Sequence, residues 1–135
     1  YFRICAVVSV MNAFHILDFY KWCVDSKFIL PTDFKLDSLS MPEHYNIQGL
    51  PLEIKNKVVE RYNEFFESYL VQFDDETLDY VKSQFENVLN HMNATQTSTI
   101  NDFSEENSKL DNIRDENFSE IFPEMYNLLN YHYEH

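Results

Sequence analysis

The sequence predicts an α/β fold: a fragment holding the terminal βαβ unit of a partial parallel β/α barrel, followed by a mostly helical C-terminal extension. Three observations lead to this prediction. Residues 3–12 form an apolar run rich in β-branched residues, a helical pattern follows over 13–28, and most later residues show helical periodicity. An apolar strand of this kind is typical of parallel sheets, in which strands are buried on both faces.

The first strand and the first helix follow one another without a linker. Tyr1 and Phe2 lead almost directly into the apolar run at Ile4, so we expect the chain to be the tail of a larger α/β protein. Over 13–28 the polar residues lie on one stripe, and the opposite apolar face suits packing on a sheet. The alternation at 34–39 predicts a second strand, and the crossover between parallel strands should be right-handed.

Residues 41–51 are rich in turn-forming residues, and we expect Tyr45 and Ile47 to anchor this irregular segment. Pro51 suits the first turn of a helix. Apolar residues then recur every three or four positions at Val58, Tyr62, Phe65, Tyr69 and Phe73.

Asp74 and Asp75 should end that helix and cap a second, antiparallel one. Its apolar positions are Leu78, Val81, Phe85, Val88 and Met92. The sequence predicts a loop over 93–101, a third helical region over 110–122, and a last short helix opened by Pro123. We therefore place a boundary between 1–48, the last strand–helix–strand portion of the barrel, and 49–135, the helical extension.

Composition limits what the chain can do by itself. Its 135 residues suffice for about one domain, and 44% hydrophobic with 16% aromatic residues predict a core built largely from rings. The chain contains a single glycine, Gly49, where average usage gives about nine. Because phosphate-binding loops need glycine, the loops that hold a cofactor should lie elsewhere.

The net charge of −13 argues against nucleic-acid and membrane-surface binding, because such a surface repels phosphate and anionic lipid. The acidic exterior either keeps an aromatic-rich protein in solution or receives a basic partner. No apolar stretch reaches membrane-spanning length and no segment resembles a signal peptide. Cys5 and Cys23 form no metal-binding pair, and we expect both to be buried, reduced thiols in a cytoplasmic protein.

Polar side chains at the end of the first strand are the candidate site. In parallel sheets, functional residues gather at the carboxyl ends of strands, which here carry Ser9, Met11 and Asn12. The alternative is structural: Asn12 caps the following helix and Ser9 bonds to local backbone. The five histidines form no catalytic set, and a metal site at His132 and His135 has little support.

Three patches together resemble one family. They are VVSVMNAFHILDFYKW at 7–22, PEHYNIQGLPLEIKNKV at 42–58 and LDNIRDENFSEIFPEM at 110–125. In order and spacing they are similar to the C-terminal part of radical SAM proteins with a twitch subdomain, found in bacteria and phages. The resemblance implies a partial β/α barrel with a [4Fe–4S] cluster that cleaves S-adenosylmethionine reductively to a 5′-deoxyadenosyl radical. It also implies that Ser9, Met11 and Asn12 lie near the cofactor and substrate.

The chain departs from that family because it contains no CxxxCxxC motif. An iron–sulfur cluster normally needs four cysteine thiolates or a close substitute, so this chain cannot perform the reaction alone. It is either a fragment whose cluster-binding half is missing or a degenerate relative, and the start within a strand favours a fragment. The resemblance predicts a C-terminal fragment of a radical SAM enzyme, whose partners are the remainder of its own barrel and a peptide or protein substrate. The alternative is a non-enzymatic, acidic helical module that binds a protein through an exposed aromatic face.

Overall fold

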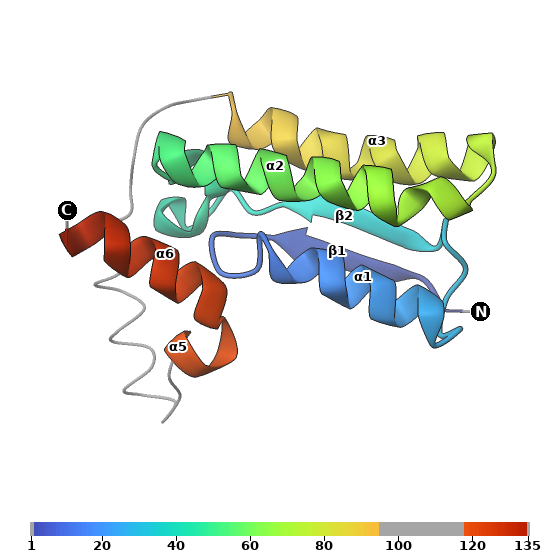
Figure 1. Ribbon diagram of the computed structural model, residues 1–135, viewed down its shortest axis with the longest axis horizontal. Coiled ribbons are helices and arrows are strands. Elements are labelled where there is room, and N and C mark those ends of the chain that lie inside the picture. The colour runs from blue at the N-terminus through green and yellow to red at the C-terminus, as the bar shows by residue number, and fades with distance from the viewer. Residues whose placement is uncertain (1, 95–117, 135) are drawn as a thin grey trace.

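The computed structural model describes residues 2–94 and 118–134, and it is an α/β structure built on two parallel strands. Strand β1 (Ile4–Val8) pairs with β2 (Phe34–Ser38), with Ile4 opposite Phe34. Helix α1 (His15–Asp25) connects them. In Figure 1 both strands run from right to left and α1 returns in front of them, which makes the crossover right-handed. The predicted βαβ unit is confirmed.

Two long helices follow the sheet and lie antiparallel beside each other (Figure 1). They are α2 (Leu52–Ser68) and α3 (Asp75–Met92), joined by the 3-10 helix η3 (Leu70–Gln72). Two further 3-10 helices, η1 (Glu43–Tyr45) and η2 (Ile47–Gly49), lie in the segment predicted to be irregular. The C-terminal region holds α5 (Phe118–Ile121) and α6 (Pro123–Glu134). The predicted loop and the start of the third helical region fall mainly within 95–117, outside the described residues.

Local chemistry explains where several of these helices begin. The Asp74 carboxylate accepts a hydrogen bond of 2.7 Å from the Thr77 N–H, so the predicted cap of α3 is confirmed. Pro51 directly precedes α2, and α6 begins at Pro123. Helix α1 differs, because its N-cap is Phe14 and no side chain caps it.

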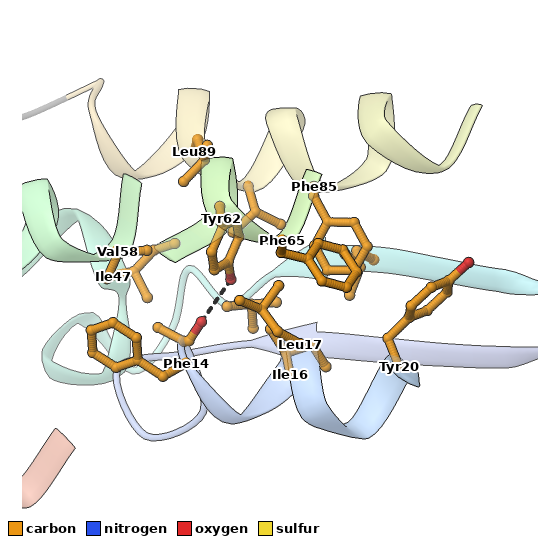
Figure 2. Packing of buried hydrophobic residues seen from close by; sticks show 14 of the residues in the cluster. Phe14, Ile16, Leu17, Tyr20, Ile47, Val58, Tyr62, Phe65, Phe85 and Leu89 are labelled. Carbon is orange, nitrogen blue, oxygen red and sulfur yellow. Dashed lines mark hydrogen bonds between the residues drawn. The ribbon is translucent and has the colours of Figure 1, made fainter. Parts of the chain in front are cut away.

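The core is one aromatic cluster shared by the sheet and the helices. Helix α1 covers one face of the sheet, α3 lies along the outer edge of β2, and α2 packs on both helices (Figure 1). The ring of Tyr20 on α1 lies 5.0 Å from that of Phe34 on β2 and 5.5 Å from that of Phe85 on α3. Figure 2 shows the rings of Phe65 and Phe85 beside Tyr62 in this layer. The core thus runs without interruption across the position between residues 48 and 49.

The prediction that the first strand is buried on both faces is wrong. Ile4, Ala6 and Val8 face the helices, but Cys5 and Val7 on the opposite face are exposed, Val7 by 48%. The next strand follows the same pattern, with Lys35 and Asp37 exposed. The reason is that no helix of the described residues lies over this side, which we call the bare face.

The two thiols therefore differ. Cys23 lies on the buried face of α1 as predicted, whereas the prediction of a buried Cys5 is wrong. Alternation along a strand places Cys5 on the side opposite its neighbours Ile4 and Ala6, and that side has no cover.

Replacing Tyr62 by phenylalanine should lower the free energy of unfolding by about 1–3 kcal/mol. The Tyr62 hydroxyl is fully buried and donates a hydrogen bond of 2.8 Å to the Ala13 carbonyl, drawn as the dashed line in Figure 2. Without it, that carbonyl is left unpaired in the core. Urea unfolding of the wild-type chain and of Tyr62→Phe measures the difference.

Tyr69→Phe is the matched control, because it deletes the same hydroxyl from an exposed hydrogen bond to Asp25. Water replaces that bond, so its effect should be the smaller of the two. Equal losses in the two variants would contradict the assigned role of Tyr62.

Candidate functional site at the carboxyl end of the first strand

The turn after β1 is held by the side chain of Asn12. Its Oδ1 accepts a hydrogen bond of 2.8 Å from the Ser9 N–H, and its Nδ2 donates one of 2.9 Å to the Val7 carbonyl. The partners fix the orientation of the amide, since one needs an acceptor and the other a donor. Asn12 therefore closes back onto the strand, and it does not cap α1 with its side chain as the structural alternative expected.

Ser9 and Met11 occupy the same turn. The Ser9 hydroxyl accepts a hydrogen bond of 3.2 Å from the Met11 N–H, which agrees with the local role expected for Ser9. Met11 lines a cavity of about 150 Å³ between this turn and the C-terminal helices. Its other lining residues include His15 and Phe122, whose rings meet edge to face at 5.8 Å. The three predicted site residues are thus neighbours in one turn.

The segment after β2 returns to this turn. The Val10 N–H donates to the Tyr45 carbonyl at 2.9 Å, and the Leu39 N–H donates to the Val8 carbonyl at 2.9 Å. The predicted anchors Ile47 and Tyr45 are buried and half-buried respectively. The rings of His44 and Tyr45 lie with their centroids 4.5 Å apart and are tilted by 47° relative to each other. This packing brings residues 41–50 to the carboxyl end of the sheet.

A polar network joins that segment to the end of α3. The Asn46 Oδ1 accepts from the Gln48 N–H at 2.9 Å and lies 3.0 Å from the Nε2 of His91. The Gln48 Nε2 donates to the His91 carbonyl at 2.9 Å. Because Asn46 offers an oxygen, the neutral ring of His91 carries its proton on Nε2. Sequence reasoning missed this network, since nothing in the spacing of residues 46, 48 and 91 joins them.

The stability of the chain should depend on the neutral form of His91. Burial lowers the pKa of His91 below its ordinary value, so between the two values the unfolded chain binds more protons than the folded chain. This contribution is complete above the unfolded pKa and is lost as pH falls from that value through the folded pKa. We expect stability to fall more for the wild type than for His91→Gln between pH 7.5 and pH 5.5, measured by urea unfolding.

Both proteins carry the same 23 Asp and Glu residues. The pH dependence that comes from these carboxylates therefore cancels in the difference between the wild type and His91→Gln. Identical changes in unfolding free energy for the two proteins would show that His91 does not contribute.

Two larger cavities lie away from the turn. One of about 400 Å³ separates α2 from α6, where Arg61 pairs through two nitrogens with the Glu124 carboxylate. The other, about 650 Å³, lies beside Phe2, Phe28 and Asp33 at the opposite end of the sheet. Neither cavity contains Ser9, Met11 or Asn12.

The second of these cavities adjoins a group of exposed rings. The Phe2 and Phe28 rings stack at 5.0 Å, and Trp22, which is 59% exposed, lies 6.1 Å from Phe28. We call Phe2, Trp22 and Phe28 the aromatic patch. Exposed apolar side chains that lie next to one another in this way mark candidate sites for binding a partner.

The residues present do not fit an iron–sulfur cluster. Within 2–94 and 118–134, no group of three or more His, Cys, Asp or Glu side chains is arranged to hold a metal ion. Cys5 lies on the bare face and Cys23 lies on the buried face of α1, so the two thiols do not form part of one ligand set. No chemical step can be assigned to such a cluster from this chain.

Comparison with protein-family models, curated proteins and solved structures finds no match to this chain. Among the helices of the described residues, none combines the length and apolarity that a membrane span needs.

Proposed function

We propose that this chain forms the closing βαβ segment and the C-terminal helical cover of a cytoplasmic radical SAM enzyme with a partial β/α barrel. The observation that carries the proposal is the bare face of a parallel sheet. In a β/α barrel, helices cover one side of the strands and the other side faces the barrel interior. The exposed side chains of Cys5, Val7, Lys35 and Asp37 would then line that interior.

The turn after β1 would lie at the mouth of that barrel. Functional residues of β/α barrels lie at the carboxyl ends of the strands. Asn12 uses one donor and one acceptor of its amide within the turn, which leaves one of each for a ligand. Ser9, Met11 and Asn12 are therefore proposed contacts for S-adenosylmethionine, while the cluster ligands belong to another part of the parent enzyme. A peptide or protein is its proposed substrate.

The coding sequence upstream of Tyr1 tests this proposal most directly. We expect a CxxxCxxC motif within a series of βα repeats in the same reading frame. The full-length product, reconstituted without oxygen with iron and sulfide, should release 5′-deoxyadenosine from S-adenosylmethionine when given a reductant. Alanine at each motif cysteine should abolish that product, whereas Cys5→Ser and Cys23→Ser should retain it. A start codon directly before Tyr1 would overturn the proposal.

The aromatic patch favours a second candidate, a protein-binding module without enzymatic activity. Phe2, Trp22 and Phe28 expose large apolar area of the kind that protein partners cover. The two candidates differ in how the 135-residue chain behaves by itself. A sharp, cooperative melt of a monomer favours the module, and a broad transition favours the barrel segment, whose sheet lacks neighbours.

A further inference from the structure

The outer edge of β1 carries hydrogen-bonding groups that its neighbours leave unused. In parallel strands, the N–H and C=O of one residue point to the same side, and the side alternates along the chain. The Ile4 N–H donates to the Asp33 carbonyl and the Val8 carbonyl accepts from the Leu39 N–H, both at 2.9 Å. Ile4, Ala6 and Val8 therefore face β2 with their backbone groups, and Cys5 and Val7 face away from it.

The outer edge of β2, by contrast, is covered. Its Leu36 N–H donates a hydrogen bond of 3.1 Å to the Oε1 of Gln84, which projects from α3. Figure 1 shows α3 running along that side of the sheet. The open edge of the described sheet is therefore that of β1 alone.

Asn12 closes the last part of the β1 edge. Through its amide it supplies a donor to the Val7 carbonyl and an acceptor to the Ser9 N–H. A neighbouring strand would offer the same pair of groups, so Asn12 takes the place of a strand at this point. Within the described residues, the Cys5 N–H, the Cys5 carbonyl and the Val7 N–H remain without a partner.

These three groups determine what can cover the edge. They recur at the two-residue repeat of a strand, about 6.6 Å, and an extended backbone presents partners at that spacing. The side chains of the same residues, Cys5 and Val7, are small and apolar, so they leave room for an added strand. A second copy of the chain is disfavoured because each copy carries a net charge of −13.

We propose that the outer edge of β1 is a strand-addition site for one extended polypeptide segment other than a second copy of this chain. The segment pairs with the backbone of Cys5 and Val7, and it ends at Asn12. This inference depends only on the backbone groups of β1, and it holds with or without the radical SAM assignment. Its failure is therefore distinct from a missing CxxxCxxC motif.

Amide hydrogen exchange of the 135-residue chain, followed by NMR, tests the proposal. The probe is a peptide with the sequence of residues 33–39, DFKLDSL, with both ends blocked, because this sequence already pairs with β1 in parallel. In the free chain the Cys5 and Val7 amides should exchange rapidly, while those of Ala6 and Val8 are protected. Millimolar peptide should slow exchange at Cys5 and Val7 by about tenfold or more.

Two N-methylated peptides provide the control for backbone pairing. Each has the same side chains as the probe; one is methylated on alternate residues and the other on every residue. An extended peptide carries N–H groups along both edges, so the first keeps one edge that can pair and should still bind, whereas the second has no donor on either edge and should not. Equal binding by both methylated peptides, or unchanged exchange at Cys5 and Val7 with the unmodified probe, overturns the proposal.

The free chain provides a further check on the occupant. Protected Cys5 and Val7 amides in a monomer would mean that another part of the same chain already covers the edge. The same protection in a dimer would mean that a second copy covers it. Either result overturns the proposal.

Asn12→Ala tests where the added segment ends. This substitution frees the Val7 carbonyl and the Ser9 N–H, so the Ser9 amide should exchange rapidly in the free variant and slowly with peptide. Asn12→Asp is the control, because its carboxylate still accepts from the Ser9 N–H but gives no donor to Val7. A Ser9 amide that stays unprotected with peptide in Asn12→Ala contradicts the assigned limit. Protection at Ala6 reports that the variant is folded.

Discussion

Replacement of Phe85 by alanine should lower the free energy of unfolding by about 3–5 kcal/mol. The Phe85 ring is fully buried and lies 5.0 Å from Phe65, 5.5 Å from Tyr20 and 5.8 Å from Tyr62. Its removal leaves a cavity where α1, α2 and α3 meet. Urea titration of the wild-type chain and of the variant measures the loss.

Two controls separate the cavity from a general sensitivity of the aromatic residues. Phe85→Leu keeps much of the volume and should cost clearly less than alanine. Phe73→Ala removes the same side chain from a half-buried position whose ring contact is with Tyr69 at 5.8 Å. A loss in Phe73→Ala as large as in Phe85→Ala would contradict the central place of Phe85.

Helix positions could be predicted because local signals agree with the final packing. Pro51, Asp74 and Pro123 mark helix starts through backbone chemistry that acts within one turn, and the structure places helix starts beside all three. The apolar positions Val81 and Phe85 are buried because their spacing places them on one face of α3. Such signals need no knowledge of distant residues.

The bare face of the sheet could not be predicted from the same signals. An apolar run such as residues 4–8 is compatible with burial on one face or on both. The choice depends on where the helices pack, and α2 and α3 join α1 on one side because Tyr62 and Phe85 complete the core there. Cys5 and Val7 are exposed as a consequence of these long-range contacts.

The position of the candidate site was predicted, but the hydrogen bonds of its side chains were not. Ser9, Met11 and Asn12 do lie together at the carboxyl end of β1, because a turn of four residues keeps its members adjacent. The role of Asn12 was missed, since an asparagine directly before the helical pattern also suits a helix cap. Its position beside an open strand edge becomes visible only when the direction of each backbone group is known.

A proline scan of β1 should separate the two edges of this strand. Ala6→Pro removes an N–H that points toward β2 and should unfold the chain or cost at least about 2 kcal/mol, because a ladder bond is lost in the sheet. Val7→Pro removes an N–H from the outer edge, where proline is tolerated, and should cost distinctly less. Circular dichroism with urea unfolding compares the two variants, which carry the same ring one residue apart.

Val7→Pro also tests whether the peptide binds at the outer edge of β1. This variant should remain folded but should no longer bind the peptide of residues 33–39, because its proline offers no donor at the centre of the edge. A folded Val7→Pro chain that binds the peptide as tightly as the wild type would show that the peptide lies elsewhere. Equal destabilisation by Ala6→Pro and Val7→Pro would show that both edges of β1 are already paired, since only a paired N–H makes proline costly at position 7.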